Sequence, residues 1–364
     1  MENQRIYNFS AGPSELPLEV LERAAKEMTN YANSGMGVME MSHRSKVYLG
    51  IYEETITKFK RIFNVPDNYK VLFLQGGATL QFAMIPMNLM TKNKKADYLV
   101  TGSFSGKAQQ EASKYGTANV AFTGKAEGFT RIPTQEELKL DPEADYVHYC
   151  DNNTIFGTKF NYVPETGNVP LVCDMSSCIL SEVVDVSKFG LIYAGAQKNM
   201  GPAGLAVVVI REDLLGDPVE NTPVMLEYKT MVENDSMYNT PNTWGIYILG
   251  LMLDWVEANG GVAGMAEQAV KKSQMIYDFI DASNGYYKNP NEKASRSKMN
   301  VVFRLPNEDL EAKFAKESAA AGMSNLKGHR SAGGIRASIY NAMPVEGIQF
   351  LVDFMKKFME NNPA

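Results

Sequence analysis

Short apolar runs alternate with longer amphipathic stretches as far as Asn259. Each apolar run is bounded by glycine, proline or polar residues and is short enough to predict a buried strand. The predicted strands are 69–74, 96–101, 145–150, 170–174, 191–194 and 205–211. The amphipathic stretches predict helices over 17–31, 46–63 and 244–257, with further helix starts near 79 and 104. Strands that alternate with helices are typical of a doubly wound α/β sheet.

The pattern changes after Asn259, where long helices are interrupted by few strands. Helices are predicted over 265–280, 308–321 and 345–359, and strands over 298–305 and 335–340. This mixture predicts a smaller α+β domain. A chain of 364 residues also exceeds what one hydrophobic core usually supports, so a large and a small domain are expected.

Lys198 is the first candidate for chemistry, because it lies in a turn between two predicted strands. The turn is rich in small residues that allow sharp bends and the close approach of a flat ligand, namely Gly195, Ala196, Gly201, Pro202, Ala203 and Gly204. Asp174 ends another predicted strand, and open α/β sheets place ligand-binding groups at such ends. Pyridoxal phosphate needs an amine for covalent attachment and a carboxylate that keeps its pyridine nitrogen protonated. Lys198 and Asp174 fit these roles, although such a pair is more often a surface lysine and a helix cap.

Other groups at strand ends suit the same ligand. Gly77 and Ala78 lie where a predicted strand meets a helix, and the free N–H groups of a helix start bind phosphate. Phe104 can stack on a flat ring, or it can belong to the core. Thr154, in a polar loop after the strand at 145–150, can offer its hydroxyl to the cofactor.

Cationic side chains recur near opposite ends of the chain, in two His-Arg-Ser triplets. Imidazole and guanidinium groups bind phosphates and carboxylates, so a substrate with two anionic groups would make the recurrence functional. The residues are His43, Arg44, His329 and Arg330, with Arg336 in the strand that follows. Asn239 and Thr240 precede a proline at a helix start, where they either cap the helix or reach an anion.

Composition narrows the possible partners. The net charge is -6 with both signs interspersed, whereas nucleic-acid binding needs a concentrated basic face. The 3 cysteines, Cys150, Cys173 and Cys178, lack metal-site spacing and are expected to be reduced, mostly buried thiols. The sequence shows neither an apolar run of about 18 residues nor a signal-peptide pattern. We therefore expect a soluble, cytoplasmic protein that acts on small molecules, with no metal, nucleic acid or membrane as partner.

Several longer motifs occur in order along the chain. They are 8–13 (NFSAGP), 41–45 (MSHRS), 74–79 (LQGGAT), 174–177 (DMSS), 185–190 (DVSKFG), 193–204, 238–241 (YNTP) and 328–342. With these motifs the chain resembles the phosphoserine aminotransferases, class V enzymes of the pyridoxal phosphate fold type I, along nearly its whole length. The resemblance implies a large domain with a mostly parallel seven-stranded sheet over residues 16–258, and a smaller α+β domain formed by residues 1–15 and 259–364. It also implies reversible amino transfer between glutamate and 3-phosphohydroxypyruvate, giving 2-oxoglutarate and O-phosphoserine, in serine biosynthesis.

The resemblance also assigns roles to single residues. The cofactor would be held by Gly77, Ala78, Phe104, Thr154, Asp174, Gln197 and Lys198, with Asn239 and Thr240 from the partner subunit. The substrate would be held by Arg336 at its α-carboxylate, and by His329, Arg330 and the partner's His43 and Arg44 at its phosphate or distal carboxylate. The active unit would therefore be a homodimer with shared active sites. The related 4-phosphohydroxy-threonine of pyridoxine biosynthesis is a further possible substrate.

Some positions depart from the family pattern. Phe104 stands where tryptophan is usual, which keeps the stacking but removes an N–H donor. Asn153 stands where glutamate is usual, and Cys178 where aspartate or asparagine is usual, which leaves cofactor tuning and substrate preference open. Two other functions stay open as well. A cysteine desulfurase or lyase of the same fold would need a mobile cysteine near the lysine, and a noncatalytic scaffold would bind no cofactor.

Overall fold

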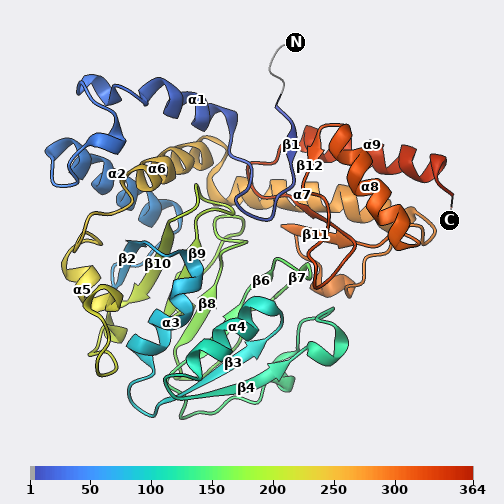
Figure 1. The fold of residues 1–364 in the computed structure, drawn as a ribbon. Helices are drawn as coiled ribbons and strands as arrows, with labels where there is room; N and C mark the ends of the chain where they lie inside the picture. Colours follow the sequence, from blue (N-terminus) through green and yellow to red (C-terminus); the bar gives the residue numbers. More distant parts are fainter. Residues whose placement is uncertain (1–4, 364) are drawn as a thin grey trace.

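The computed structural model describes residues 5–363, and a seven-stranded sheet lies at its centre (Figure 1). The strand order is β2-β10-β9-β8-β5-β3-β4. The strands are β2 (Tyr69–Leu74), β3 (Lys95–Val100), β4 (Thr117–Thr123), β5 (Val147–Cys150), β8 (Leu171–Asp174), β9 (Leu191–Gly195) and β10 (Ala206–Arg211). β10 runs antiparallel to both of its neighbours and the other pairs are parallel, which confirms the mostly parallel sheet.

Helices cover both faces of this sheet (Figure 1). One face is covered by α2 (Lys46–Ile62) and α6 (Thr243–Ala258), with α1 (Leu18–Glu27) packed against α6. The other face is covered by α3 (Gly77–Leu89), α4 (Ser103–Ala112) and α5 (Tyr228–Glu233). The doubly wound arrangement predicted from the alternating pattern is therefore present.

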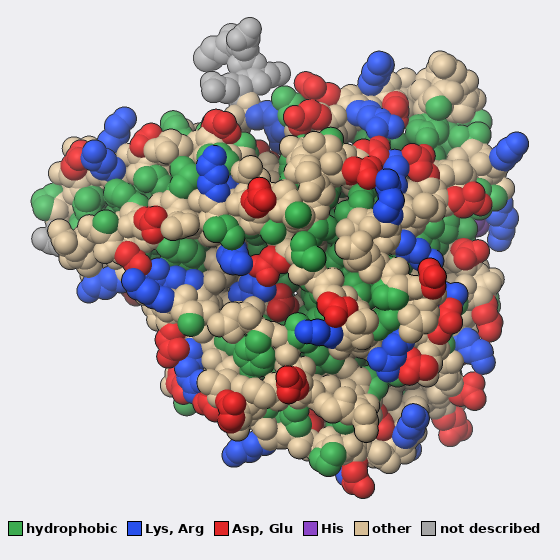
Figure 2. Space-filling model, turned by 180° about the vertical axis from the view of Figure 1, so that it is seen from behind, with side chains coloured by type: hydrophobic (Ala, Val, Ile, Leu, Met, Phe, Trp, Pro, Cys, Tyr) green, Lys and Arg blue, Asp and Glu red, His purple; other side chains and the backbone are tan. Residues whose placement is uncertain are grey.

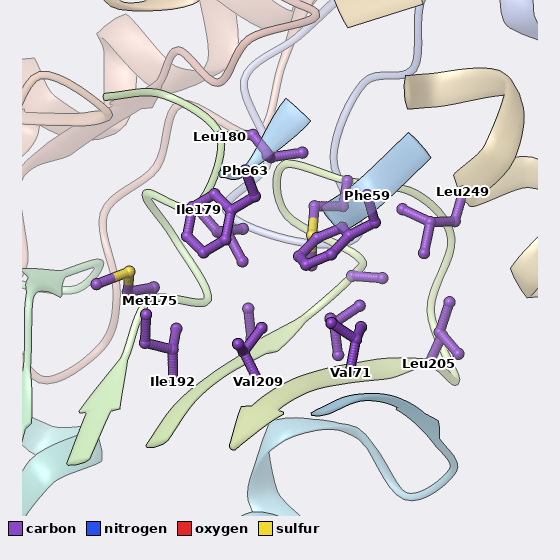
Figure 3. Close-up of a cluster of buried hydrophobic side chains, with 14 of the residues drawn as sticks. Phe59, Phe63, Val71, Met175, Ile179, Leu180, Ile192, Leu205, Val209 and Leu249 are labelled. Carbon is purple, nitrogen blue, oxygen red and sulfur yellow. The ribbon is translucent and has the colours of Figure 1, made fainter. Parts of the chain in front are cut away.

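Alternate residues of β10 show why the central strands are so apolar. Val209 packs into the cluster on the α2–α6 face, together with Phe59 and Leu249 (Figure 3). Val208 packs into the cluster on the opposite face, beneath α3 and α4. A strand that is buried on both faces needs apolar side chains at successive positions, which is why these strands stand out in the sequence as continuous apolar runs.

The elements β4 and α5 were not predicted. β4 lies at the edge of the sheet, and most of its residues are at least partly exposed. Because an edge strand is not buried on both faces, its sequence, Thr-Ala-Asn-Val-Ala-Phe-Thr, contains no continuous apolar run. α5 has only 6 residues, too few to show a helical period.

A second core lies beyond α6. It is built by α7 (Gly261–Ala282), α8 (Glu308–Ala320) and α9 (Val345–Asn361), with the antiparallel pair β11 (Asn300–Phe303) and β13 (Ile335–Ser338). β1 (Tyr7–Asn8) pairs with β12 (Met323–Ser324), and Phe9 joins this core, so segments near both ends of the chain pack together. A short hairpin of β6 (Asn152–Asn153) and β7 (Thr158–Lys159) reaches this core from the large sheet through a bridge between Thr158 and Arg296. The domain boundaries at 15/16 and 258/259 stay a prediction.

The surface carries charges of both signs. Figure 2 shows lysine and arginine side chains interspersed with aspartate and glutamate over one face, without a concentrated basic area on that face. No helix within residues 5–363 is long and apolar enough to cross a membrane. Within the same residues, no three or more His, Cys, Asp or Glu side chains are grouped so that they could hold a metal ion.

Candidate active site

Lys198 lies in the turn that joins β9 to β10, at the carboxyl ends of the central strands. Its Nζ donates a hydrogen bond to Thr154 Oγ1 at 2.7 Å and lies 4.9 Å from the centre of the Phe104 ring. Burial lowers the pKa of this amine, although the nearby Asp174 carboxylate opposes the shift. A lowered pKa increases the fraction of neutral amine, which is the nucleophilic and basic form.

The N-terminal segment braces the lysine turn. Ser14 donates through its backbone N–H to Gln197 O at 3.0 Å and through its hydroxyl to Lys198 O. A Cβ atom on Gly12, whose φ is +129°, would lie only 3.0 Å from Lys198 Cγ. Glycine at position 12 therefore allows the two segments to approach this closely, a contact that sequence reasoning did not find.

Asp174 is the last residue of β8 and borders the same space as Lys198. Its Oδ1 accepts a hydrogen bond from the backbone N–H of Ser176 at 2.9 Å, and Ser176 Oγ accepts from Gly195 N–H at 3.0 Å. These contacts hold the carboxylate in place and leave its second oxygen for a donor in the cavity. Ser176 is a supporting residue that the sequence analysis missed, although its position two residues after the strand-end acid is a usable signal.

The start of α3 forms a cradle for an anion. Gly76 has a φ of +83° and Gly77 a φ of +62°, and a Cβ atom on Gly76 would lie 2.4 Å from Leu80 Cδ2. Glycine is therefore required at position 76 for the sharp entry into α3, whose first N–H groups are free to bind an anion. The Gln197 side chain borders the same cavity, and its Oε1 is buried without a hydrogen-bond partner in residues 5–363.

These groups surround one cavity of about 320 Å³. Its lining includes the predicted Gly77, Ala78, Phe104, Asp174, Gln197 and Lys198. An amine, a carboxylate, an aromatic face and a helix start fit an aromatic aldehyde that carries a phosphate. The Gln197 amide borders this cavity, and because its Oε1 has no partner in residues 5–363, the amide is available to a polar ligand. The residues present therefore fit pyridoxal phosphate.

Arg336 lies on β13 and reaches the large sheet from the second core. Its Nη1 lies 3.4 Å from Thr154 O, and its Nε is buried without a partner among the described residues. Burial lowers the pKa of this guanidinium, yet the ordinary pKa of arginine lies so far above neutral that the group stays charged near neutral pH. A buried guanidinium with free donors is suited to an anionic group of a ligand.

His329 lies close enough to Arg336 to be affected by its charge. Burial and the charges of Arg336, Arg330 and Lys107, in that order, lower the pKa of its imidazole. Lys107, on α4, was not among the predicted residues, and its Nζ lies 5.8 Å from the centre of the Phe104 ring. Its position three residues after the predicted aromatic was the signal that could have identified it.

His43, Arg44, Asn239 and Thr240 lie outside the lining of the lysine cavity in the single chain. His43 is buried just before α2, and its Nε2 has no hydrogen-bond partner in residues 5–363, whereas Arg44 is exposed. The backbone oxygen of Thr240 accepts a hydrogen bond from Gln75 Nε2 at 2.7 Å. Thr154, His329, Arg330 and Arg336 are not part of that lining either, but Thr154 is hydrogen-bonded to Lys198 and Arg336 to Thr154, so one chain connects these two residues to the cavity.

Of the three departures from the family pattern, Phe104 lines the cavity, whereas Asn153 and Cys178 occupy buried positions outside its lining. Asn153 donates to Thr101 Oγ1 at 3.2 Å and to Thr158 Oγ1 at 3.1 Å. Cys178 donates its thiol to Asp151 Oδ2 at 3.1 Å. Burial raises the pKa of all 3 cysteine thiols, and none of them lines the lysine cavity. This placement argues against a desulfurase, which needs a mobile cysteine beside the lysine.

Comparisons with known proteins agree with this arrangement. The family model "Aminotransferase class-V" matches residues 6–351. A phosphoserine aminotransferase of Nitrosomonas europaea is 52% identical over 367 residues, covering 99% of this chain and 100% of the relative. A phosphoserine aminotransferase structure from Bacillus circulans subsp. alkalophilus has a TM-score of 0.96 at 48% identity, covering 98% of this chain and 99% of that one. A PLP-bound phosphoserine aminotransferase structure from Trichomonas vaginalis has a TM-score of 0.93 at 42% identity, covering 97% and 100%.

Proposed function

The chain belongs to the phosphoserine aminotransferases of the class V family, and from this membership we propose that it transfers an amino group reversibly between glutamate and 3-phosphohydroxypyruvate. The products are 2-oxoglutarate and O-phosphoserine, so the enzyme is a pyridoxal-phosphate-dependent transaminase of serine biosynthesis. The observation that carries the proposal is the cavity where Lys198, Asp174 and the start of α3 meet. A scaffold without catalysis would have no need for this combination.

Each predicted cofactor residue has a role in this proposal. When bound, pyridoxal phosphate supplies an aldehyde that bonds to amines and a ring that withdraws electrons from the substrate Cα. Asp174 would hold a proton on the ring nitrogen, Phe104 would stack on the ring and Thr154 would donate to the phenolic oxygen. The phosphate would be held by the amides of Gly77 and Ala78, by Gln197, and by Asn239 and Thr240 of a second copy. Lys198 Nζ would be the covalent anchor and would also serve as the base for the proton on the substrate Cα.

The substrate residues must accept two kinds of anion. Both amino acids carry an α-carboxylate, which Arg336 binds with two parallel hydrogen bonds. Glutamate ends in a carboxylate and O-phosphoserine in a phosphate, and His329 and Arg330 bind either because both groups present oxyanions. His43 and Arg44 of a second copy complete this end of the site. The related 4-phosphohydroxy-threonine carries the same two anionic groups, so the site accepts it as well.

A homodimer follows from the positions of the remaining residues. His43 and Arg44 lie on a segment that also exposes Met36 (40%), Met39 (57%) and Val47 (41%). Exposed apolar side chains gathered on one segment indicate a surface that another chain covers. A second copy seated there would bury them and carry His43 and Arg44 toward its own lysine cavity. We place this dimer in the cytoplasm.

Mixed dimers test the shared site. Lys198→Ala and Arg44→Ala variants, each impaired alone, are mixed, and their subunits are allowed to exchange. Each mixed dimer should regain one intact site, with Lys198 from one subunit and Arg44 from the other. Recovery of activity supports the shared site. A mixture no more active than its components, when exchange has been demonstrated with differently tagged subunits, contradicts it.

The reaction itself is tested by absorbance. Purified protein is loaded with pyridoxal phosphate, and its spectrum is recorded before and after the addition of O-phosphoserine, with serine as the phosphate-free control. Conversion of the aldehyde-form band to the pyridoxamine form by O-phosphoserine alone supports both amino transfer and phosphate recognition. Conversion by neither amino acid overturns the proposed reaction.

A further inference from the structure

A buried network of hydrogen bonds lies behind the lysine cavity and joins the large sheet to the second core. We call it the Asn300 network, and its members are Asn152, Ser177, Ser297, Asn300, Ser338 and Tyr340. Each member has at most 2% of its surface exposed. Burying polar groups this deeply is unfavourable unless every group is hydrogen-bonded, so the completeness of the network matters.

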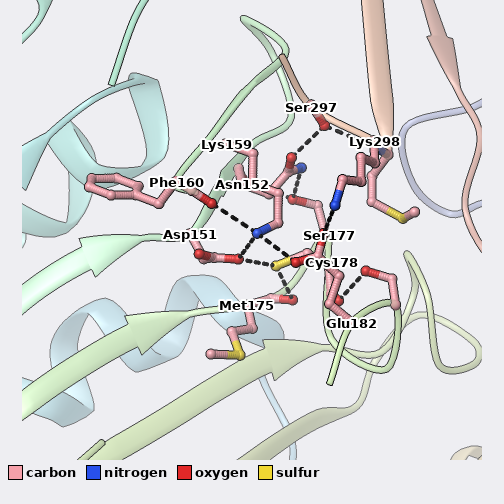
Figure 4. Close-up of polar contacts among 12 residues, drawn as sticks. Asp151, Asn152, Lys159, Phe160, Met175, Ser177, Cys178, Glu182, Ser297 and Lys298 are labelled. Carbon is pink, nitrogen blue, oxygen red and sulfur yellow. Dashed lines mark hydrogen bonds and ion pairs between the residues drawn. The ribbon is translucent and has the colours of Figure 1, made fainter. Parts of the chain in front are cut away.

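The half of the network next to the large sheet is centred on Asn152, as Figure 4 shows for Asn152, Ser177 and Ser297. Asn152 Nδ2 donates to Ser177 Oγ at 2.7 Å and to Asn300 Oδ1 at 2.8 Å. Ser177 Oγ donates to the backbone oxygen of Asn152 at 2.9 Å, and Ser297 Oγ donates to Asn152 Oδ1 at 2.5 Å. All the hydrogen-bonding groups of the Asn152 amide therefore have partners.

The other half of the network is centred on Asn300, in β11. Its Nδ2 donates to Ser338 Oγ at 2.9 Å and to Tyr340 Oη at 3.2 Å. Tyr340 Oη donates in turn to the backbone oxygen of Ala11, in the segment that braces the lysine turn. Asn300 thus accepts one hydrogen bond and donates two, a combination that an amide offers and a carboxylate does not.

The network connects the segments that carry the active-site groups. Asn152 lies two residues before Thr154, the hydrogen-bond partner of Lys198, and Ser338 lies two residues after Arg336. The direct contact between these segments is weak, because Arg336 Nη1 lies 3.4 Å from Thr154 O. Since Arg336 Nε has no partner in residues 5–363, the position of the guanidinium depends on where its strand is held.

We propose that Asn300 is a positioning residue for the substrate carboxylate. By holding β13 through Ser338 and the β6 segment through Asn152, it sets the distance between the Arg336 guanidinium and the Lys198 amine. This inference rests on the proposed function, in which Arg336 binds the α-carboxylate while Lys198 takes the proton from the adjacent Cα. Both groups must reach neighbouring atoms of one small molecule, so a displacement of β13 weakens substrate binding.

The test uses Asn300→Ala in the cofactor-loaded enzyme. We measure KM for O-phosphoserine and for glutamate, the affinity for pyridoxal phosphate, and the Kd for glutarate by calorimetry. Glutarate carries two carboxylates but no amine to react, so it reports binding without turnover. Both KM values and the glutarate Kd should rise about tenfold, because the guanidinium is displaced. Cofactor affinity should stay unchanged, whereas a general loosening of the fold would lower it too.

A milder variant covers the case in which Asn300→Ala does not fold. Ser338→Ala removes one hydroxyl from the network, and it should raise the same KM values and glutarate Kd by roughly threefold. The matched control is Asn362→Ala, whose buried amide donates to Phe358 O at 2.8 Å far from β13 in the sequence and outside the network, and which should leave substrate binding unchanged. Normal KM and glutarate Kd values in folded Asn300→Ala or Ser338→Ala protein overturn the proposal, as does an equal loss of cofactor and glutarate affinity.

Arg336→Lys separates this inference from the proposed function. If Arg336→Lys weakens glutarate binding and Asn300→Ala does not, the positioning role is wrong and the proposed site stands. If Arg336→Lys itself leaves glutarate binding and both KM values unchanged, the assigned carboxylate site is wrong, and the inference built on it is wrong with it.

Discussion

Lys198 and Lys272 both bury an amino group, but the surroundings of the two groups differ. Lys272, on α7, is 1% exposed and donates to backbone oxygens in the segment 340–343 at 2.7, 3.4 and 2.9 Å. Lys198 has the Thr154 hydroxyl at 2.7 Å and otherwise faces a cavity of about 320 Å³. Burial lowers the pKa of both amines, that of Lys272 to about 7.

The difference shows that a perturbed pKa alone does not identify a reactive lysine. The ammonium of Lys272 donates to the backbone oxygens of Tyr340, Asn341 and Met343, so this lysine joins α7 to the segment after β13. Lys272 also borders a cavity and has the Glu15 carboxylate nearby, so neither feature distinguishes the two lysines. The difference is that Lys198 makes only one side-chain hydrogen bond and keeps hydrogen-bonding capacity for a ligand. Reactivity follows from unfilled hydrogen-bonding capacity beside a cavity, and buried polar groups elsewhere in the molecule are structural.

The largest expected effect is on Lys198. Lys198→Ala should lower the turnover of O-phosphoserine by at least about 10³-fold, because both the covalent anchor and the base are lost. The thermal unfolding midpoint without cofactor should change little, since the amine makes one side-chain hydrogen bond. Lys188→Ala, at an exposed position, is the control. Retained transamination by the Lys198 variant would show that another group carries the reaction.

The opposite result is expected for Lys272. Lys272→Met should lower the free energy of unfolding by about 3 kcal/mol, because a chain of similar length leaves buried carbonyl oxygens without donors. Turnover at a temperature well below unfolding should stay within a factor of about two, as expected for a group with no role in the chemistry. Urea unfolding and steady-state kinetics measure the two quantities. Lys271→Met, one position earlier and exposed, should change neither.

A smaller effect is expected for Arg336. Arg336→Lys should lower kcat/KM roughly 30-fold for glutamate and for O-phosphoserine alike, because a point charge replaces a two-pronged donor. An equal loss with both substrates indicates contact with the α-carboxylate, which they share. A loss confined to O-phosphoserine would instead assign Arg336 to the phosphate end. Arg211→Lys, which keeps its surface pairing with Asp213, is the control.

The smallest effect concerns His148, a buried imidazole on β5 that is hydrogen-bonded to Tyr193 Oη at 2.9 Å and does not line the lysine cavity. Burial lowers its pKa to about 3 from the ordinary 6.5, so the unfolded chain takes up a proton between these values that the folded chain does not. The free energy of unfolding should therefore fall as the pH decreases below 6.5, by up to about 1.4 kcal/mol per pH unit from this residue.

His148→Phe removes this dependence and keeps the stacking on Tyr98, whose ring centre lies 4.9 Å away. Urea unfolding of both proteins without cofactor at pH 7.5, 6.5 and 5.5 measures the pH dependence of the free energy of unfolding. Between pH 6.5 and 5.5 the free energy of unfolding should fall by about 1 kcal/mol more for the parent than for the variant. Above pH 7 the free energies of the two proteins should change in parallel. Parallel curves over the whole range would mean that His148 is protonated in the folded protein.

The elements of the large sheet were predictable because their burial leaves a strong local signal. β2, β8, β9 and β10 are apolar at successive positions, and their predicted bounds differ from the observed ones by about one residue. β4 was missed because an edge strand has weaker constraints on its side chains. The strands of the second core, predicted over 298–305 and 335–340, are shorter than expected, at Asn300–Phe303 and Ile335–Ser338.

The chemistry was predictable where one segment carries the signal. Lys198 stands in a turn of small residues, Asp174 ends a strand and Gly77 begins a helix, and each pattern is legible within a few neighbouring positions. These residue types by themselves only suggested the ligand class, and the resemblance carried by the longer motifs decided in its favour. Their motifs also indicated the family, which the comparisons confirmed.

The sequence by itself therefore determined most of the strand-and-helix order, the cofactor class and the lysine proposed to anchor the cofactor. Only the tertiary structure decided which buried polar groups have hydrogen-bond partners within the chain and which keep donors or acceptors for a ligand. Asn152 and Asn300 are 148 residues apart, yet they share a hydrogen bond at 2.8 Å, and nothing near either residue predicts the other. Lys272 and Lys198 likewise become distinguishable only when their surroundings are assembled. A side chain's type is a local property, whereas its hydrogen-bond partners are set by segments that meet only in the folded chain.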